Sequence, residues 1–469
     1  MKKQGEGIRA QGTGKDKGKS KGAGVPGGFA SKAGGFARRR PVSAGPTLSA
    51  GESLAKVSPA RRVAFEILLL VGQGKGHSDE LLHSARTEAL SVEDRNLATA
   101  LVMGVLRWEI ALDARVRGFL ERPDQRLAEP VALALRMGAF QLLHMDRIPA
   151  HAALSESVEL CRAFEQPHAT GMVNAVLRKV AAAQKPGTRI FESTAAFSER
   201  LGHPRWLVER WVTAYGREAA LKICEAGQRE PDEARLFAAV SEDAAKAIPV
   251  MDDGSRLVAE IAAAAVPGAK RVWDCCAAPG GKTLVLALRE PEAKVLATDV
   301  SVKRTAAMTR RLERFGYGDR VKTGVADAAI DGSSQVRGEF DLILCDVPCS
   351  GTGTLARNPE IRLQLQPEEL VRQATRQRAI LAGALKRLAP GGRLVYSTCS
   401  LEPEENEAVV AAVVSDSEYR RVPVGELIGS LGVLAEGVNL GSAVRDGALR
   451  TLPGVHGCDG FFAVVLERS

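Results

Sequence analysis

The chain has 469 residues, of which 45% are hydrophobic, so it is long and apolar enough for two or three domains with packed cores. Its formal net charge is +8, but residues 1–40 hold eleven Lys and Arg against two acidic residues, which leaves the rest of the chain close to neutral. Composition therefore excludes a strongly basic folded body, and overall charge alone is no argument for nucleic-acid binding.

Residues 1–57 are expected to form a disordered basic tail. The first forty contain eleven glycines and almost no large aliphatic side chains, so they cannot bury enough surface to offset the entropy of ordering. Such a tail either adds salt-sensitive affinity for RNA or is a solvated leader with no specific role. The chain has no secretory h-region and no apolar run of roughly 18–20 residues, so we expect a cytoplasmic protein without membrane contact.

Residues 58–185 are predicted to be all-helical. Ser58 and Pro59 form a helix start signal, with Ser58 as the N-cap, and apolar residues then recur at helical spacing. Glycines and prolines separate the helical segments. Further helices are expected at 94–120, 129–145, 151–164 and 168–183. Periodicity alone describes a helical bundle and leaves open a purely structural or oligomeric role.

Residues 186–252 are expected to hold linker helices, with one at 203–211, and 253–469 an α/β domain. From Val272 onward, apolar strand patterns alternate with helical ones, which predicts βαβ units and a mostly parallel, Rossmann-like sheet. Strands are expected at 271–276, 294–300, 320–326, 340–347 and 392–398, and an antiparallel C-terminal strand at 460–466.

The segment DCCAAPGGKT (274–283) predicts a sharp turn from the first strand into a helix. Its glycines allow close backbone approach by a ligand, and a helix N-terminus favours a carboxylate or phosphate. A Walker A loop would need glycine at Cys276, and a dinucleotide GxGxxG is absent. The turn therefore suits S-adenosylmethionine, with the methionine carboxylate over the loop.

Two aspartates follow the next strands. Asp299 ends the second strand, where an acid in Rossmann-like sheets binds ribose hydroxyls, although it could instead be an exposed N-cap of the next helix. Asp327 ends the third strand and could receive an adenine amino group. Strand-end aspartates are common, so Asp327 alone indicates little.

Two motifs place thiols just after buried strands: DVPCSGTG (346–353), with Cys349, and YSTCSLEPEENE (396–407), with Cys399. Methylation of the poorly nucleophilic C5 of cytosine requires a thiolate that adds to C6, a carboxyl group at the N3/N4 edge and help for elimination. Asp346 and the two cysteines offer these groups. Taken singly, the cysteines could be small strand-end hydrophobes. A zinc site built from Cys345, Cys349 and the 275–276 pair is a further alternative, but the spacing does not fit and no histidine is near.

Together these motifs resemble the Sun family of RNA (cytosine-5)-methyltransferases, and within it the bacterial RsmB-type enzymes of 16S ribosomal RNA that carry a NusB-like RNA-binding domain. The resemblance runs from about residue 59 to the C-terminus. It includes PGVHGCDGFF (453–462) and, in the helical region, DRNLA (94–98), LVMGVLR (101–107), RMGAFQLL (136–143), RIPAHAA (147–153) and VNAVLR (173–178).

The resemblance implies that residues 58–185 bind RNA and that 253–469 form the methyltransferase domain. It implies Cys399 as nucleophile, Cys349 in product release and Asp346 in base recognition. The cofactor pocket would comprise Cys276, Ala277, Ala278, Pro279, Gly280, Gly281, Lys282, Asp299, Asp327 and Asp346, with S-adenosyl-L-methionine as cofactor.

The implied partner is RNA, most simply 16S rRNA, with no metal, no membrane and no obligate protein partner. The alternatives are a transfer-RNA cytosine-5 methyltransferase and a non-catalytic RNA-binding ribosome-assembly factor. The sequence departs from the family in one place: between the Trp-containing helix and the sheet, only residues 234–256 stand where the family usually carries a longer RNA-binding insert.

Overall fold

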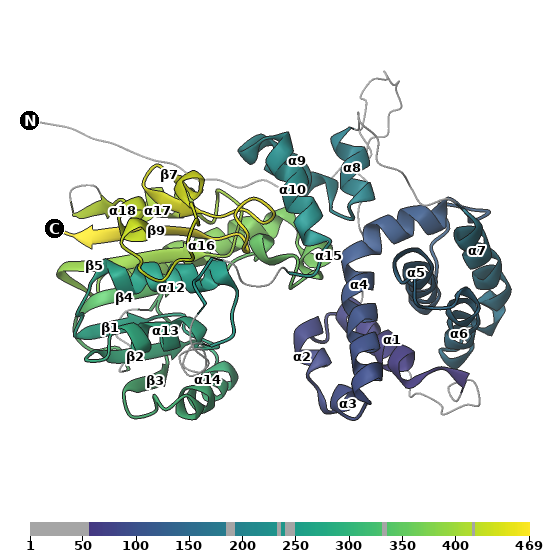
Figure 1. Cartoon of the computed structure of the whole chain (residues 1–469), viewed down its shortest axis with the longest axis horizontal. Helices are drawn as coiled ribbons and strands as arrows, with labels where there is room; N and C mark the ends of the chain where they lie inside the picture. Colours follow the sequence, from purple (N-terminus) through teal and green to yellow (C-terminus); the bar gives the residue numbers. More distant parts are fainter. Residues whose placement is uncertain (1–55, 184–192, 232–235, 240–248, 331–334, 415–417) are drawn as a thin grey trace, which may run out of the picture. The chain divides into compact units, whose positions relative to one another are not determined.

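The computed structural model describes residues 56–183, 193–231, 236–239, 249–330, 335–414 and 418–469 (Figure 1). Residues 1–55, nearly all of the tail expected to be disordered, lie outside the described residues. So do 232–235 and 240–248 of the shortened insert. In the part of the chain that the structure describes, no helix is long and apolar enough to cross a bilayer.

The first region is all-helical, as predicted. Its helices are α1 (Pro59–Gly72), α2 (Ser78–Leu82), α3 (Ala85–Glu88), α4 (Val92–Arg117), α5 (Glu129–His144), α6 (Ala150–Ala163), the 3-10 helix η2 (Pro167–Ala169) and α7 (Thr170–Ala182). The predicted ends differ by one to three residues, since helix termini leave backbone groups that caps and turns resolve locally. The short α2 and α3 were not predicted, because four or five residues carry too little periodicity.

Local signals explain where these helices begin. Ser91 caps α4 by accepting a hydrogen bond from the backbone N–H of Asp94 at 3.1 Å. Ser58 is the N-cap residue of α1, as predicted, but its side chain makes no capping bond; its hydroxyl donates to Glu156 at 2.7 Å. The Ser58 oxygen accepts instead from Arg61 Nη1 at 3.0 Å, a charged donor.

Three further helices follow: α8 (Thr194–Arg200), α9 (Arg205–Tyr215) and α10 (Arg217–Gly227). The helix predicted at 203–211 is present as α9, which buries Trp211. Of the shortened insert, the stretch 236–238 pairs in backbone hydrogen bonds with 433–435 near the C-terminus.

The α/β region is one mixed sheet of nine strands in the order β3-β2-β1-β4-β5-β9-β8-β7, with β6 also paired to β9. Strands β1 to β5 are parallel, and β9 is antiparallel to β5, so the predicted fold class is confirmed. The strands are β1 (Arg271–Asp274), β2 (Lys294–Asp299), β3 (Val321–Val325), β4 (Phe340–Asp346), β5 (Leu388–Thr398), β6 (Tyr419–Val422), β7 (Val444–Arg445), β8 (Ala448–Arg450) and β9 (Phe462–Arg468).

Two details of the sheet differ from the prediction. Strands β6, β7 and β8 were missed because segments of two to four residues show no readable alternation. Strand β5 begins at Leu388 rather than 392, because the register between Phe340 and Leu342 shifts and accommodates Gly391 and Gly392 as an irregularity instead of a break.

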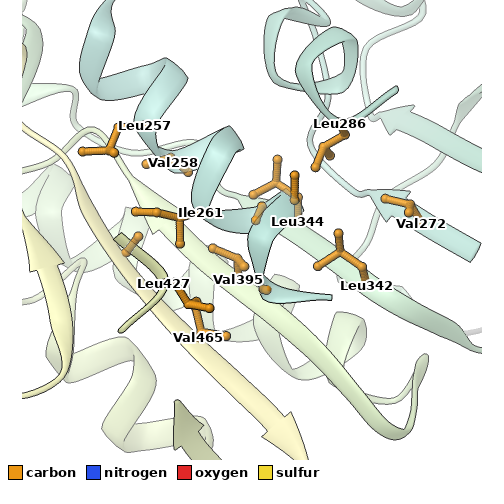
Figure 2. Packing of buried hydrophobic residues seen from close by; sticks show 14 of the residues in the cluster. Leu257, Val258, Ile261, Val272, Leu286, Leu342, Leu344, Val395, Leu427 and Val465 are labelled. Carbon is orange, nitrogen blue, oxygen red and sulfur yellow. The ribbon is translucent and has the colours of Figure 1, made fainter. Parts of the chain in front are cut away.

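Helices cover both faces of the sheet. One face packs against α12 (Asp253–Ala265), α13 (Gly281–Arg289), α14 (Val302–Arg314) and α18 (Val424–Gly429), and the other against α16 (Pro367–Leu385) and α17 (Glu407–Val413). Figure 2 shows Ile261 of α12 among Leu344 and Val395 of the strands. Burial on both faces makes the strand sequences continuously apolar and leaves polar residues to the strand ends.

Candidate active site

The carboxyl ends of β4 and β5 bring the two thiol motifs together. The parallel register pairs Asp346 with Ser397, and the Ser397 hydroxyl donates to Asp346 Oδ1 at 2.7 Å. Three residues beyond Asp346 and two beyond Ser397, the chain reaches Cys349 and Cys399. Their Sγ atoms lie 3.3 Å apart, and both side chains are half-buried. The two predicted cysteines therefore share one site.

A glycine sets how closely these loops approach. The backbone N–H of Gly353 donates to the carbonyl of Cys399 at 2.9 Å, and its carbonyl accepts from Gly460 N–H at 2.8 Å. A Cβ at Gly353 would lie 2.1 Å from the Gly460 oxygen and 2.8 Å from the Cys399 oxygen. Only glycine fits between these two backbones.

Lys282 joins the site from the start of α13. Its Nζ lies 2.7 Å from Asp346 Oδ2 and 5.2 Å from the centroid of the Phe461 ring. Burial acts to lower the pKa of Lys282, but Asp346, and after it Cys399, more than offset burial, so this pKa lies above its ordinary value. Lys282 is thus a cation beside both a carboxylate and the Cys399 thiol.

The loop before Lys282 turns as the sequence predicted. Gly280 adopts a left-handed conformation (φ 91°) as the N-cap of α13, and a Cβ there would lie 2.9 Å from Met308 Cγ. Ala277 N–H donates to Thr298 O at 2.8 Å, and the Ala278 carbonyl accepts from Arg304 at 2.5 Å. The N-terminus of α13 therefore opens toward the ends of β1 and β2.

Asp274, at the end of β1, belongs to this site and was not singled out from the sequence. It is buried; Thr283 Oγ1 donates to its Oδ2 at 2.6 Å, whereas Oδ1 has no partner among the described residues. Burial raises the pKa of Asp274 to about 7 against the hydrogen bond from Thr283, with charges of Asp346, Lys282 and Asp299 also acting on it. Its position, last in a buried strand before a glycine-rich turn, was the available signal.

Asp299 and Asp327 follow β2 and β3. Asp299 is 4% exposed, accepts from Ser301 N–H at 2.9 Å and lies 3.4 Å from Arg304. The alternative of an exposed N-cap is wrong for Asp299, because Ser301 is the N-cap of α14 and accepts from Arg304 N–H. Asp327 is half-buried and accepts from Ala329 N–H at 2.9 Å.

The other cysteines near the site are inert by environment. Cys275 and Cys345 are buried and Cys276 is half-buried. The hydrogen bond with Cys275 and burial both raise the pKa of Cys276 well above its ordinary value. All eight cysteines are free, and within the described residues no group of three or more His, Cys, Asp or Glu side chains is arranged to hold a metal ion. The zinc alternative therefore gains no support.

The residues present fit S-adenosylmethionine. The orphaned oxygen of buried Asp274 can bind a cationic or N–H-bearing group, the α13 N-terminus can receive a carboxylate, and Asp299 offers a carboxylate at the neighbouring strand end. Cys349 and Cys399 follow the adjoining strands β4 and β5, and Lys282 joins them from α13.

Comparison with known proteins agrees with this geometry. Residues 58–182 match the NusB family, and residues 264–467 match the family described as 16S rRNA methyltransferase RsmB/F. The crystal structure of PH0851 is similar with a TM-score of 0.67 at 22% identity, over 88% of this chain and 99% of that chain, which shows a shared fold.

Two curated relatives span nearly the same length. The probable ribosomal RNA small subunit methyltransferase B of Bacillus subtilis (strain 168) is 32% identical over 88% of this chain and 100% of its own. The ribosomal RNA small subunit methyltransferase B of Xanthomonas campestris pv. campestris is 31% identical over 90% and 100%. These matches confirm the resemblance and the enzyme class inferred from the sequence, and they disfavour a non-catalytic assembly factor. The chain therefore belongs to the RsmB/F family of 16S rRNA methyltransferases.

Proposed function

We propose that this chain transfers a methyl group from S-adenosylmethionine to C5 of a cytosine in 16S rRNA, through a covalent adduct between Cys399 and C6 of the base. The observation that carries the proposal is the meeting of Cys349, Cys399 and the Lys282–Asp346 pair at one edge of the sheet. Because the family is defined by 16S rRNA methylation, we place the target there rather than in transfer RNA. We place the reaction in the cytoplasm, with the ribosomal RNA.

The domain limits are part of the proposal. Residues 58–185 would bind RNA, 186–252 would link, and 253–469 would carry the chemistry. The cofactor, when bound, supplies an electrophilic methyl group. The turn from Cys276 through Lys282 would receive its carboxylate, Asp299 its ribose hydroxyls and Asp327 its adenine amino group.

Adduct formation uses the groups around Lys282. The Cys399 sulfur would add to C6 as a thiolate, since the thiolate is the nucleophilic form and Lys282 stabilises a negative charge there. Asp346 would bond the N3/N4 edge of the base, and Lys282, 2.7 Å from Asp346, would supply the proton that N3 gains as C6 is attacked. The electron pair displaced from the C5–C6 bond makes C5 a nucleophile toward the methyl group.

Release reverses the addition. C5 loses its proton to water, the C5–C6 double bond re-forms, N3 returns its proton, and the C6–S bond breaks with its electron pair on Cys399. Cys349 lies 3.3 Å from that sulfur and would donate a hydrogen bond to it as it departs. The two thiols would thus have different roles: Cys399 is the nucleophile, and Cys349 keeps its proton and donates a hydrogen bond to the departing sulfur.

Mutation of each thiol tests this division. Cys399→Ala is expected to abolish both methyl transfer and adduct formation with 5-fluorocytosine RNA, in which fluorine blocks loss from C5. Cys349→Ala is expected to add to the base but release slowly, so a protein–RNA complex accumulates on denaturing gels. Cys161→Ala, which removes a buried thiol from α6, is the control. If Cys349→Ala and Cys399→Ala exchanged behaviours, the assignment would be wrong.

A further inference from the structure

A buried carboxylate lies beneath both thiol loops. Glu405, in the turn before α17, is fully buried. It accepts hydrogen bonds from Ser350 N–H at 2.8 Å and from Gln377 Nε2 at 3.0 Å, and from the hydroxyls of Ser350 and Ser400. Ser350 directly follows Cys349, and Ser400 directly follows Cys399. One side chain therefore bonds to the neighbour of each thiol.

The contacts of Glu405 are with hydrogen-bond donors. Ser350 N–H and the NH2 group of Gln377 can only donate, and the Ser400 hydroxyl accepts from Glu402 N–H at 3.0 Å while it donates to Glu405. Within the described residues, no Lys or Arg forms an ion pair with Glu405. In contrast, Glu402 in the same turn forms an ion pair with Arg210 at 2.7 Å and accepts a hydrogen bond from Trp211 Nε1 at 3.0 Å.

We propose that Glu405 is a positioning residue for the methyl-transfer reaction: its carboxylate aligns the Cys349 and Cys399 loops through Ser350 and Ser400 and places a negative charge beside the Cys349 loop. This inference rests on the proposed function, because it explains why the two thiols differ. Serine hydroxyls and one backbone N–H fix the loops without neutralising the carboxylate, so its charge acts on Cys349, the residue before Ser350.

The charges around the two thiols differ: Cys349 has a negative neighbour, Glu405, and Cys399 has a positive one, Lys282. Cys349 faces Cys399, Glu405 and, from β5, Tyr396, whose own pKa is raised by burial so that it stays neutral. The hydrogen bond with Cys399, burial, the Cys399 charge and the Glu405 charge together raise the pKa of Cys349 well above its ordinary value. Cys399 instead has the Lys282 cation beside it, with Asp346 beyond. Helix α16 contributes the uncharged Gln377.

Glu405→Gln keeps the size of the side chain and removes its charge. Cys349 then loses its proton at lower pH, so the alkaline limb of the pH–rate profile for product release should move to lower pH. Glu405→Asp keeps the charge but shortens the reach, so release should slow at every pH with the limb in place. If the alkaline limb of Glu405→Gln stayed at the same pH as in the wild type, the proposal would be overturned.

Two further variants keep the test decisive if Glu405→Gln fails to fold. Ser400→Ala removes one neutral donor, leaves more of the Glu405 charge uncompensated and should move the limb to higher pH. Glu402→Gln removes a buried charge that belongs to the Arg210 pair and should leave the limb unmoved. A downward shift in Glu402→Gln, or no shift in Ser400→Ala, would contradict the assignment of the field to Glu405.

A second readout does not depend on turnover. Mass spectrometry of iodoacetamide-treated protein gives the pH dependence of Cys349 alkylation, and Glu405→Gln should move it to lower pH even in a Cys399→Ala background. Equal alkylation profiles would refute the role of Glu405 and leave the covalent mechanism intact. Methyl transfer by Cys399→Ala would refute the covalent mechanism and leave the alkylation result standing.

Discussion

A buried arginine of the helical region (59–182) and two buried acids of the sheet region (271–468) have different kinds of partner. In the helices, Arg61 lies 2.7 Å from Glu156 and donates to Gln141 at 2.7 Å, so a buried cation meets a half-buried anion. In the sheet region, Asp274 and Glu405 meet mainly hydroxyl and amide donors. A matched ion pair holds both partners in one charge state, whereas carboxyl groups among neutral donors can change protonation or impose a field.

Glycine serves the two regions differently as well. A Cβ at Gly104 in α4 would lie 1.9 Å from Phe140 Cζ, so this glycine makes room for a core side chain. At Gly353 the obstacle is the backbone of Gly460 and Cys399. A side chain can repack, but two hydrogen-bonded backbones cannot separate without moving the thiol that one of them carries. Close packing at Gly104 therefore stabilises the helical core, whereas close packing at Gly353 fixes the position of Cys399.

The largest expected effect is on the stability of the helical region. Arg61→Met leaves the half-buried carboxylate of Glu156 without its cation and the buried Gln141 oxygen without its donor, so it should lower the local free energy of unfolding by about 3–5 kcal/mol. Hydrogen exchange of α1 and α6 measures this change. Arg86→Met is the matched control, because Arg86 pairs with Glu66 while 51% exposed and should cost less than about 1 kcal/mol. Equal destabilisation of the two variants would show that the Arg61–Glu156 pair stabilises the helical region no more than the exposed Arg86–Glu66 pair does.

Gly353→Ala should act on activity instead. Displacing the Cys399 backbone by even about 1 Å should slow methyl transfer roughly 100-fold, while the free energy of unfolding falls by only about 1–3 kcal/mol. Single-turnover rates with saturating RNA provide the measurement. Gly432→Ala, where a Cβ would meet nothing within 4 Å, should behave as wild type. A Gly353→Ala protein with the wild-type rate would show that the close approach of the loops is dispensable.

The buried Asp274 predicts a pH dependence of stability. Its pKa of about 7 lies above the value near 4 of an unfolded aspartate, so its contribution is fully present below pH 4 and is lost as pH rises toward 7. The free energy of unfolding should fall by about 2–4 kcal/mol over that window and then level off. Urea denaturation from pH 5 to 8 should show a shallower fall for Asp274→Asn. Some slope remains, since Asp459 also has a pKa raised by burial to about 7. Identical slopes would count against a neutral Asp274.

The sequence predicted the site because parallel strands end at one edge of a sheet. Apolar runs located β4 and β5, and Cys349 and Cys399 then had to meet just beyond them. Glu405 could not be found in this way. It is one of four glutamates within 402–407, and only the turn before α17 decides that Glu405 points inward while Glu404 lies beside Arg210 at the surface. The sequence pattern therefore locates residues at strand ends, but only the packed structure shows which groups a buried acid such as Glu405 contacts.

The smallest expected effect concerns the positive charge of residues 1–40, which belong to neither the helical nor the sheet region. Residues 1–40 hold eleven Lys and Arg against two acids, while the rest of the chain has slightly more acids than bases. If these cations bind phosphates, deletion of residues 1–50 should flatten the plot of log K against log salt by about 0.7–0.9 for each phosphate that the tail had neutralised. Affinity should drop mainly at low salt.

Site choice should survive the same deletion, because a glycine-rich segment offers no fixed geometry for reading bases, whereas the helices and the pocket do. The rate on a short saturating RNA should persist too, since Lys282, Asp346, Cys349 and Cys399 all lie far beyond the deletion. Filter binding over a salt series tests the salt slope, and bisulfite sequencing of the rRNA locates the methylated cytosine. An unchanged salt slope would assign the RNA affinity wholly to the near-neutral folded regions. A different target nucleotide would move specificity into residues 1–50 and break the contrast between a stabilising helical region and a reactive sheet region.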